Sequence, residues 1–224
     1  DGTMPQRTGS MTDPSMAAHP RPPRGGDPTV SIIKAPIPIG AIQTSAMLNG
    51  KPISKVRRPG TRITPTMIIV HSTANPRSSA MGERNWLLNT ANDRPASWHY
   101  AVDDKQAVEA IPPSEVAHGT LDARANHSAI QVEICESGTR QQTLMNAAEL
   151  IAWLLTEYKI ARTNVFPHRQ FQKKNCPQIL PAGPAWDGFI TQVCAAITPP
   201  TAPSASMLLY SLGVPINATG WTAK

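Results

Sequence analysis

The sequence has few cysteines and no long apolar run, and both shortages narrow the classes of protein that it fits. Three cysteines are too few for a complete disulfide framework, and no two of them form a CxxC pair. No stretch of about 18 apolar residues occurs, so nothing is expected to span a bilayer. The first residues lack the basic-then-apolar pattern of a signal peptide. An extracellular destination would therefore need a leader already removed, or a route other than standard export.

Concentrated basic charge is also lacking. Lys and Arg total 21 against 15 Asp and Glu, which gives a formal net charge of +6. An excess of this size favours contact with polyanions such as nucleic acid, anionic lipid or a teichoic-acid-bearing cell wall. Because the basic residues form no long run, nucleic acid is not the expected partner.

Proline is abundant instead, and its distribution divides the chain. The 23 prolines are about twice the usual share, and they lie mainly towards the two ends. We expect a disordered tail at 1–28, whose start has the pattern of a cloning remnant, and an extended arm at 29–65. A folded domain at 66–197 follows, and then a linker at 198–224 that could begin a further module.

Apolar periodicity within 66–197 alternates between strand and helix patterns. Residues 129–135 alternate, with Ile130, Val132 and Ile134 on one face and Gln131, Glu133 and Cys135 on the other. Other strands are expected at 67–70, 97–104 and 107–111 and up to Phe166, with helices from Ser78-Ser79 to about Asn89, over 144–158, and from Pro184 to 197. Strands interleaved with helices predict an α/β fold with a central mixed β-sheet flanked by helices and an extended N-terminal arm.

One stretch near the C-terminal third carries a histidine and a cysteine eight positions apart, His168 and Cys176. Imidazole and thiolate are the ligands that zinc prefers. The best third candidate is His71, which ends the apolar run 67–70. Three protein ligands with one open position are typical of a catalytic Zn²⁺ ion rather than a structural one. The other thiols, Cys135 and Cys194, lie in apolar surroundings and are expected to be buried.

Simpler roles stay open for these residues. A histidine at a strand end, such as His71, is more often structural than a ligand, and a spacing of eight is by itself a weak zinc signal. His99 is expected to be packed within its aromatic strand, and His127 to lie on the surface.

Four motifs together resemble the zinc-dependent N-acetylmuramoyl-L-alanine amidases, the family of bacterial autolysins, phage endolysins and peptidoglycan recognition proteins. The similarity covers roughly residues 58–180 and is greatest to phage and prophage endolysins of Gram-positive bacteria. The motifs are RPGTRITPTMIIVHSTAN (58–75), SWHYAVDD (97–104), NHSAIQVEIC (126–135) and HRQFQKKNCP (168–177).

The resemblance implies a role for each matching residue. The metal ligands of the family fall on His71, His168 and Cys176, and its catalytic glutamate falls on Glu133. Beside a cation this carboxylate is expected to be ionised and ready to accept a proton from water. The lysine two positions before the third ligand is Lys174, which would support the developing oxyanion. Glu133 could instead be a paired strand-face carboxylate, and Lys174 a solvated side chain like the adjacent Lys173.

Two further residues are candidates for contact with substrate. His118 matches a loop that borders the substrate groove in relatives, although plain exposure would also explain it. Trp98 stands where some relatives carry tyrosine, which leaves Glu133 as the expected base. Trp98 could line the groove or fill the core.

The resemblance predicts a peptidoglycan hydrolase that uses zinc-activated water to cut the amide bond between N-acetylmuramic acid and L-alanine. We expect the protein to be a monomer. Residues 66–197 would form the catalytic domain, and 198–224 would lead towards a wall-binding module. A phage endolysin would pass from the host cytoplasm to the cell wall, and a bacterial enzyme would be secreted there. The alternatives are a peptidoglycan-binding module without activity, and a structural zinc domain that needs a fourth protein ligand.

Overall fold

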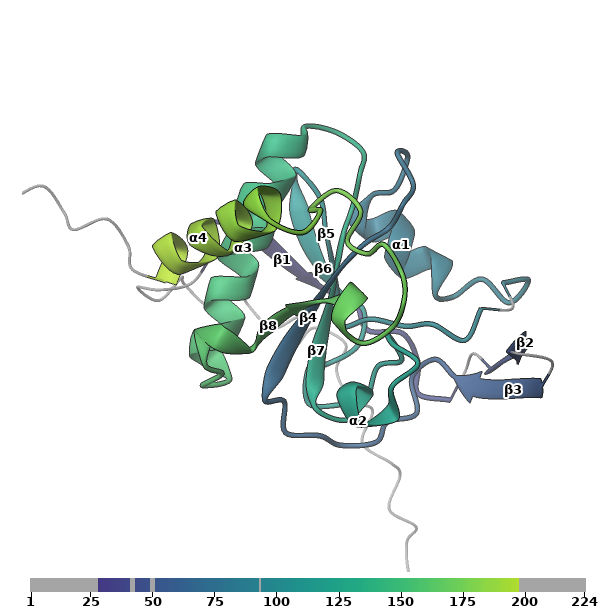
Figure 1. The fold of residues 1–224 in the computed structure, drawn as a ribbon. Helices are drawn as coiled ribbons and strands as arrows, with labels where there is room; N and C mark the ends of the chain where they lie inside the picture. The colour runs from purple at the N-terminus through teal and green to yellow at the C-terminus, as the bar shows by residue number, and fades with distance from the viewer. Residues whose placement is uncertain (1–27, 41–42, 49–50, 93, 198–224) are drawn as a thin grey trace, which may run out of the picture.

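A six-stranded mixed sheet with helices on both faces forms the centre of the protein (Figure 1). The computed structural model describes residues 28–40, 43–48, 51–92 and 94–197. The tail up to residue 27 and the segment 198–224 lie outside the described residues. The predicted α/β class is confirmed. Of the helices in the described part of the chain, none combines the length and apolar content needed to cross a lipid bilayer.

Neighbouring strands of this sheet run parallel except for the antiparallel pair β5 and β6. In sheet order they are β1 (Ser31–Lys34), β6 (Gln106–Glu109), β5 (Tyr100–Val102), β7 (Ala129–Ile134), β4 (Met67–Ser72) and β8 (Val165–Pro167). A separate hairpin joins β2 (Gln43–Leu48) to β3 (Lys51–Val56). The helices are α1 (Ala80–Trp86), α2 (Ala123–Asn126), α3 (Arg140–Glu157) and α4 (Pro184–Ile197), with short 3-10 turns η1 (Arg162–Asn164) and η2 (His168–Gln170).

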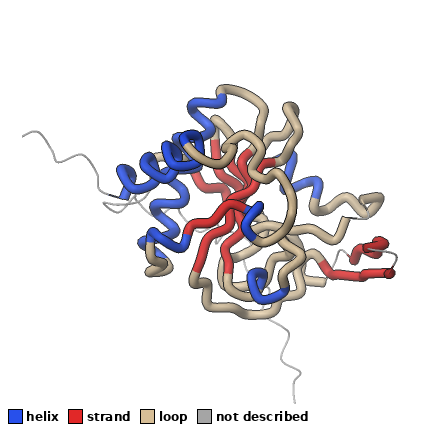
Figure 2. Tube along the Cα trace, in the orientation of Figure 1, coloured by secondary structure: helices blue, strands red, loops and turns tan. Residues whose placement is uncertain are grey.

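Helices α3 and α4 lie on one side of the sheet and α1 on the other (Figure 2), and the two faces differ in character. As predicted, Ile130, Val132 and Ile134 share one face of β7, where they join the core formed with α3 and α4. The opposite face packs against α1 in a smaller apolar cluster. Because side chains alternate along a strand, Gln131 and Glu133 belong to this second face. The sheet therefore keeps an apolar core on one side and places polar groups on the other.

Helix α1 begins where the sequence predicts and ends earlier. The Ser79 side chain accepts a hydrogen bond from Gly82 N at 3.2 Å, as an N-cap residue does. The helix stops at Trp86 rather than near Asn89. The guanidinium of Arg57 donates hydrogen bonds to the carbonyl oxygens of Leu87 and Asn89, at 2.8 and 3.0 Å. Those oxygens are satisfied from outside the helix, so the chain can leave helical geometry there.

The segment 29–65, predicted as an extended arm, supplies an edge strand and buried side chains to the domain. Strand β1 forms an edge of the sheet by pairing in parallel with β6. Ile37 and Arg57 are both fully buried. The Arg57 guanidinium also lies 5.3 Å from the ring centroid of Trp86. The arm is therefore part of the packed structure.

Two local expectations need correction. The sequence patterns do not predict helix α2. Asp122 caps this helix by accepting hydrogen bonds from Arg124 N and Ala125 N. His127 follows the helix and is exposed, as expected. Cys135 is buried, but Cys194 is only half-buried. Helix α4 buries just the side that carries Phe189 and Val193, and Cys194 lies beside this stripe rather than within it.

Replacing Arg57 with methionine is expected to lower the free energy of unfolding by roughly 3 kcal/mol, because the buried carbonyl oxygen of Leu87 loses a charged donor. Urea unfolding followed by circular dichroism measures the change. Arg94→Met, at an exposed side chain, is the matched control and should change stability by less than about 0.5 kcal/mol. Equal, small effects of both substitutions would show that the Arg57 hydrogen bonds do not stabilise the fold.

Candidate metal centre and active site

Three side chains from separate parts of the sequence converge at the carboxyl ends of β4 and β8. His71 is the penultimate residue of β4, and His168 follows β8 directly. The two strands are parallel neighbours, with Val70 opposite Pro167, so their ends bring both histidines together. His71 Nδ1 lies 2.9 Å from His168 Nδ1 and 3.9 Å from Cys176 Sγ. All three residues are buried, and their candidate ligand atoms lie within 4.8 Å of one another.

The donor set fits a zinc ion. Zn–N bonds of about 2.1 Å and a Zn–S bond of about 2.3 Å at tetrahedral angles put ligand atoms roughly 3.3–3.6 Å apart. The separations of 2.9 and 3.9 Å bracket that range. Within the described residues this cluster contains three candidate ligands, so a structural site would lack its fourth protein ligand there. That these residues bind zinc remains a prediction.

Hydrogen bonds on both sides of Cys176 hold it in position. Its carbonyl oxygen accepts from Arg169 N at 2.8 Å, and its own N–H donates to Lys174 O at 2.9 Å. After the cis peptide bond to Pro177, Gln178 N donates to the Ser72 hydroxyl at 2.9 Å. The loop is therefore attached to the end of β4, next to His71.

Burial determines the protonation of the metal-free cluster. It lowers the pKa of His71 to about 3, with the His168 ring adding to the effect. It also lowers the pKa of His168. For Cys176, burial raises the thiol pKa to about 11, and the Glu133 carboxylate contributes in the same direction. Both imidazoles are thus neutral near pH 7, as ligation requires, and the thiol must release its proton when a metal binds.

Glu133 lies beside His71 on the adjacent strand, since the β4–β7 register pairs these two residues. Its Oε2 atom is buried and has no hydrogen-bond partner among the described residues. Burial, with the Glu83 carboxylate adding to it, raises its pKa to about 8, while the Lys174 cation opposes the shift. The sequence leads us to expect an ionised carboxylate; that expectation depends on a divalent cation, which would lower this pKa.

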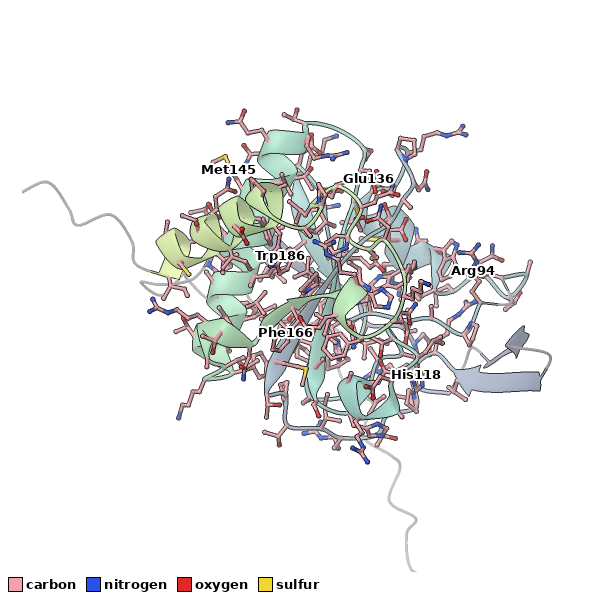
Figure 3. The ribbon with its side chains drawn as sticks, viewed as in Figure 1. Arg94, His118, Glu136, Met145, Phe166 and Trp186 are labelled. Atoms are coloured by element: carbon pink, nitrogen blue, oxygen red, sulfur yellow. The ribbon has the colours of Figure 1, made fainter. Side chains whose placement is uncertain are left out.

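The remaining predicted site residues are more peripheral. Lys174 is exposed on the 168–177 loop, and its charge affects the pKa of His71, Glu133 and Cys176. His118 is half-buried on the loop that leads to α2 (Figure 3). Trp98 is only 5% exposed and stacks on Trp86, with 5.4 Å between ring centroids. Contact of His118 and Trp98 with substrate therefore stays a prediction.

Sequence reasoning gave His99 its correct role and missed that of Gln131. His99 is fully buried, and its Nε2 bonds to Glu115 O at 2.8 Å. Gln131 bonds through Oε1 to His71 Nε2 at 2.8 Å. The alternation of β7 places Gln131 on the same face as Glu133, and a buried amide always needs partners. The alternation of β7 was therefore the sequence signal that could have identified Gln131 as a site residue.

Comparison with known proteins identifies the family. The sequence model described as N-acetylmuramoyl-L-alanine amidase matches residues 61–179. The chain belongs to this family. The amidase XlyA of Bacillus subtilis (strain 168) is 35% identical over 144 residues, which cover 62% of this chain and 47% of XlyA. The chain thus spans about half the length of this curated relative.

Solved structures of similar proteins match nearly over their whole length. The catalytic domain of XlyA superposes with a TM-score of 0.62 at 32% identity, covering 73% of this chain and 99% of that domain. A mutant endolysin from Bacillus subtilis gives the same TM-score and identity, with coverage of 74% and 99%. The sheet and its helices are therefore those of an amidase domain.

The purified protein is expected to bind one Zn²⁺ ion per chain, because two neutral imidazoles and a thiolate complete a three-ligand site. Cys176→Ala should reduce the bound zinc to background. Cys194→Ser, which removes a half-buried thiol on α4, should leave it unchanged. Elemental analysis after dialysis measures both. Full zinc content in Cys176→Ala would remove this residue from the ligand set.

Proposed function

We propose that this chain hydrolyses the amide bond between the lactyl group of N-acetylmuramic acid and the L-alanine of the peptidoglycan stem peptide. The observation that carries the proposal is the convergence of His71, His168 and Cys176 next to Glu133. Membership of the amidase family supports the same bond.

Different residues around the metal cluster have different roles in amide hydrolysis. A bound zinc ion supplies Lewis acidity, which polarises a carbonyl group and brings the pKa of water to about 7. Glu133 accepts the proton of the attacking water on its unpartnered Oε2 atom and returns it to the departing amine. The Lys174 ammonium group stabilises the negative charge that develops on the carbonyl oxygen. The buried surroundings of His71 and Cys176 limit competing water.

The biological setting we propose is lysis of a Gram-positive cell wall. A likeness of 32% identity to an endolysin of Bacillus subtilis supports it, and so does the net charge of +6, which suits a wall rich in anionic polymers. The enzyme would act at the cell wall, reached from the host cytoplasm if it belongs to a phage. Residues 198–224 would connect it to a wall-binding module.

Glu133→Gln is expected to lower the rate of wall hydrolysis by about 10²–10⁴-fold, because the amide side chain cannot accept the proton. Zinc content should stay at the wild-type level. Clearing of a suspension of purified walls measures the rate, and the release of new amino termini without new reducing sugar identifies the bond. Glu157→Gln, at an exposed residue near the end of α3, is the control. Near-normal turnover of Glu133→Gln would exclude Glu133 as the base. A wild-type protein that binds cell walls without clearing them would be a binding module and not a hydrolase.

The adjacent lysines should differ in effect. Lys174→Met is expected to reduce kcat by roughly 10²-fold with little change in KM, since its charge acts mainly on the transition state. Lys173→Met, at the neighbouring exposed position, should stay within about twofold of wild type. Steady-state kinetics on a soluble muropeptide separates kcat from KM. Indistinguishable kcat values for the two variants would mean that Lys174 is merely solvated.

A further inference from the structure

We propose that Gln131 is a positioning residue that fixes the proton of His71 on Nε2 and so presents Nδ1 as the ligand atom for the metal. Gln131 is fully buried on β7, on the same face as Glu133. This inference deepens the proposed zinc-dependent hydrolysis and rests on it for its biological meaning. A chain of hydrogen bonds, each with only one allowed direction, carries it.

The chain begins at a backbone group whose role is fixed. The N–H of Thr120 can only donate, and it points to the Oδ1 position of Asn126 at 3.0 Å. That atom of Asn126 is therefore the oxygen and not the nitrogen. The other end of the same amide agrees, because Nδ2 lies 2.9 Å from the carbonyl oxygen of Thr120. Asn126 thus has a defined orientation, and its Oδ1 is an acceptor.

The orientation of Asn126 fixes the orientation of the Gln131 amide, which in turn fixes the position of the proton on His71. Gln131 approaches Asn126 Oδ1 at 3.4 Å, so the atom on that side must be the donor Nε2. The atom on the other side, 2.8 Å from His71 Nε2, is then the oxygen Oε1. An amide oxygen only accepts, which places a proton on His71 Nε2. A ligating imidazole is neutral and carries a single ring proton, so its lone pair is on Nδ1.

Nδ1 is also the ring atom of His71 that faces the other two candidate ligands, at 2.9 Å from His168 Nδ1 and 3.9 Å from Cys176 Sγ. The hydrogen-bond direction and the geometry of the cluster therefore select the same nitrogen. A partner on the far nitrogen of a metal-binding histidine fixes its tautomer and ring orientation and typically changes metal affinity by 10–100-fold.

Gly119 leaves the space that Gln131 needs. A Cβ atom at this glycine would lie 2.5 Å from Gln131 Oε1 and 2.6 Å from its Cδ atom. Any larger residue must therefore displace the end of the glutamine side chain from His71. The backbone of Gln131 cannot follow easily, because its N–H donates to His99 Nδ1 at 2.8 Å. Gly119→Ala should consequently reproduce the effect of removing the Gln131 amide.

The test is a direct determination of the ring proton in the metal-free protein. Long-range proton–nitrogen correlation spectra of histidine-labelled protein report which nitrogen of His71 is protonated, with His71→Asn used for assignment. We expect Nε2–H in the wild type, and a loss of this single form in Gln131→Met and in Gly119→Ala. Wild-type His71 protonated on Nδ1 would overturn the inference.

Zinc affinity gives the second measurement, by competition with a chelating indicator. Gln131→Met and Gly119→Ala should each weaken zinc binding by about 10–100-fold. Gln142→Met is the matched control, because it removes a Gln-to-Asn hydrogen bond to Asn146 on α3 (2.8 Å); it should leave affinity unchanged. Unaltered affinity in both Gln131→Met and Gly119→Ala would overturn the inference.

The two proposals fail in different ways. If the wild type binds zinc and clears cell walls while His71 carries its proton on Nδ1, the role of Gln131 is wrong and the hydrolase function stands. If His71 carries its proton on Nε2 and the wild type binds no zinc, the hydrolase proposal fails first, and a metal-positioning role for Gln131 fails with it.

Discussion

The parallel pairing of β4 with β7 on one side and β8 on the other is the constraint on which the candidate site depends. Parallel neighbours end at the same edge of the sheet, so the three strands place His71, Glu133 and His168 together without any long loop. Burial of both faces of β4 explains its continuous apolar sequence. A one-residue shift of register would turn Glu133 to the core face. The hydrophobic pattern that stabilises the sheet therefore also sets the geometry of the chemistry.

The polar groups on the α1 side of the sheet show how this geometry is maintained. Burying a polar atom without a partner costs roughly 1–3 kcal/mol, and here most are satisfied: His99 by Glu115, His71 by Gln131, and Gln131 by Asn126. Among the described residues, four buried side-chain atoms lack a partner, and three of them belong to the predicted site: Glu133 Oε2, His168 Nε2 and Trp98 Nε1. Such unsatisfied atoms are expected where a ligand or a reacting water completes the set.

Sequence reasoning reached the features that repeat or that match a motif. The alternation of β7, the start of α1 at Ser79 and the convergence of His71 with His168 and Cys176 all have a local or motif signal. The role of Gln131 depends on Asn126 and Thr120, which α2 and its preceding loop bring into place. A helix of only four residues leaves no periodic pattern. The burial of Arg57 likewise depends on carbonyl groups about 30 residues away, a contact that spacing alone does not reveal.

X-ray absorption at the zinc edge of the loaded protein tests the central claim most directly, because it reports the identity and distance of the atoms around the ion. The account predicts one sulfur at about 2.3 Å, two imidazole nitrogens at about 2.0–2.1 Å and one further light atom. A spectrum without a sulfur shell, or one with four protein ligands and no open position, would contradict it.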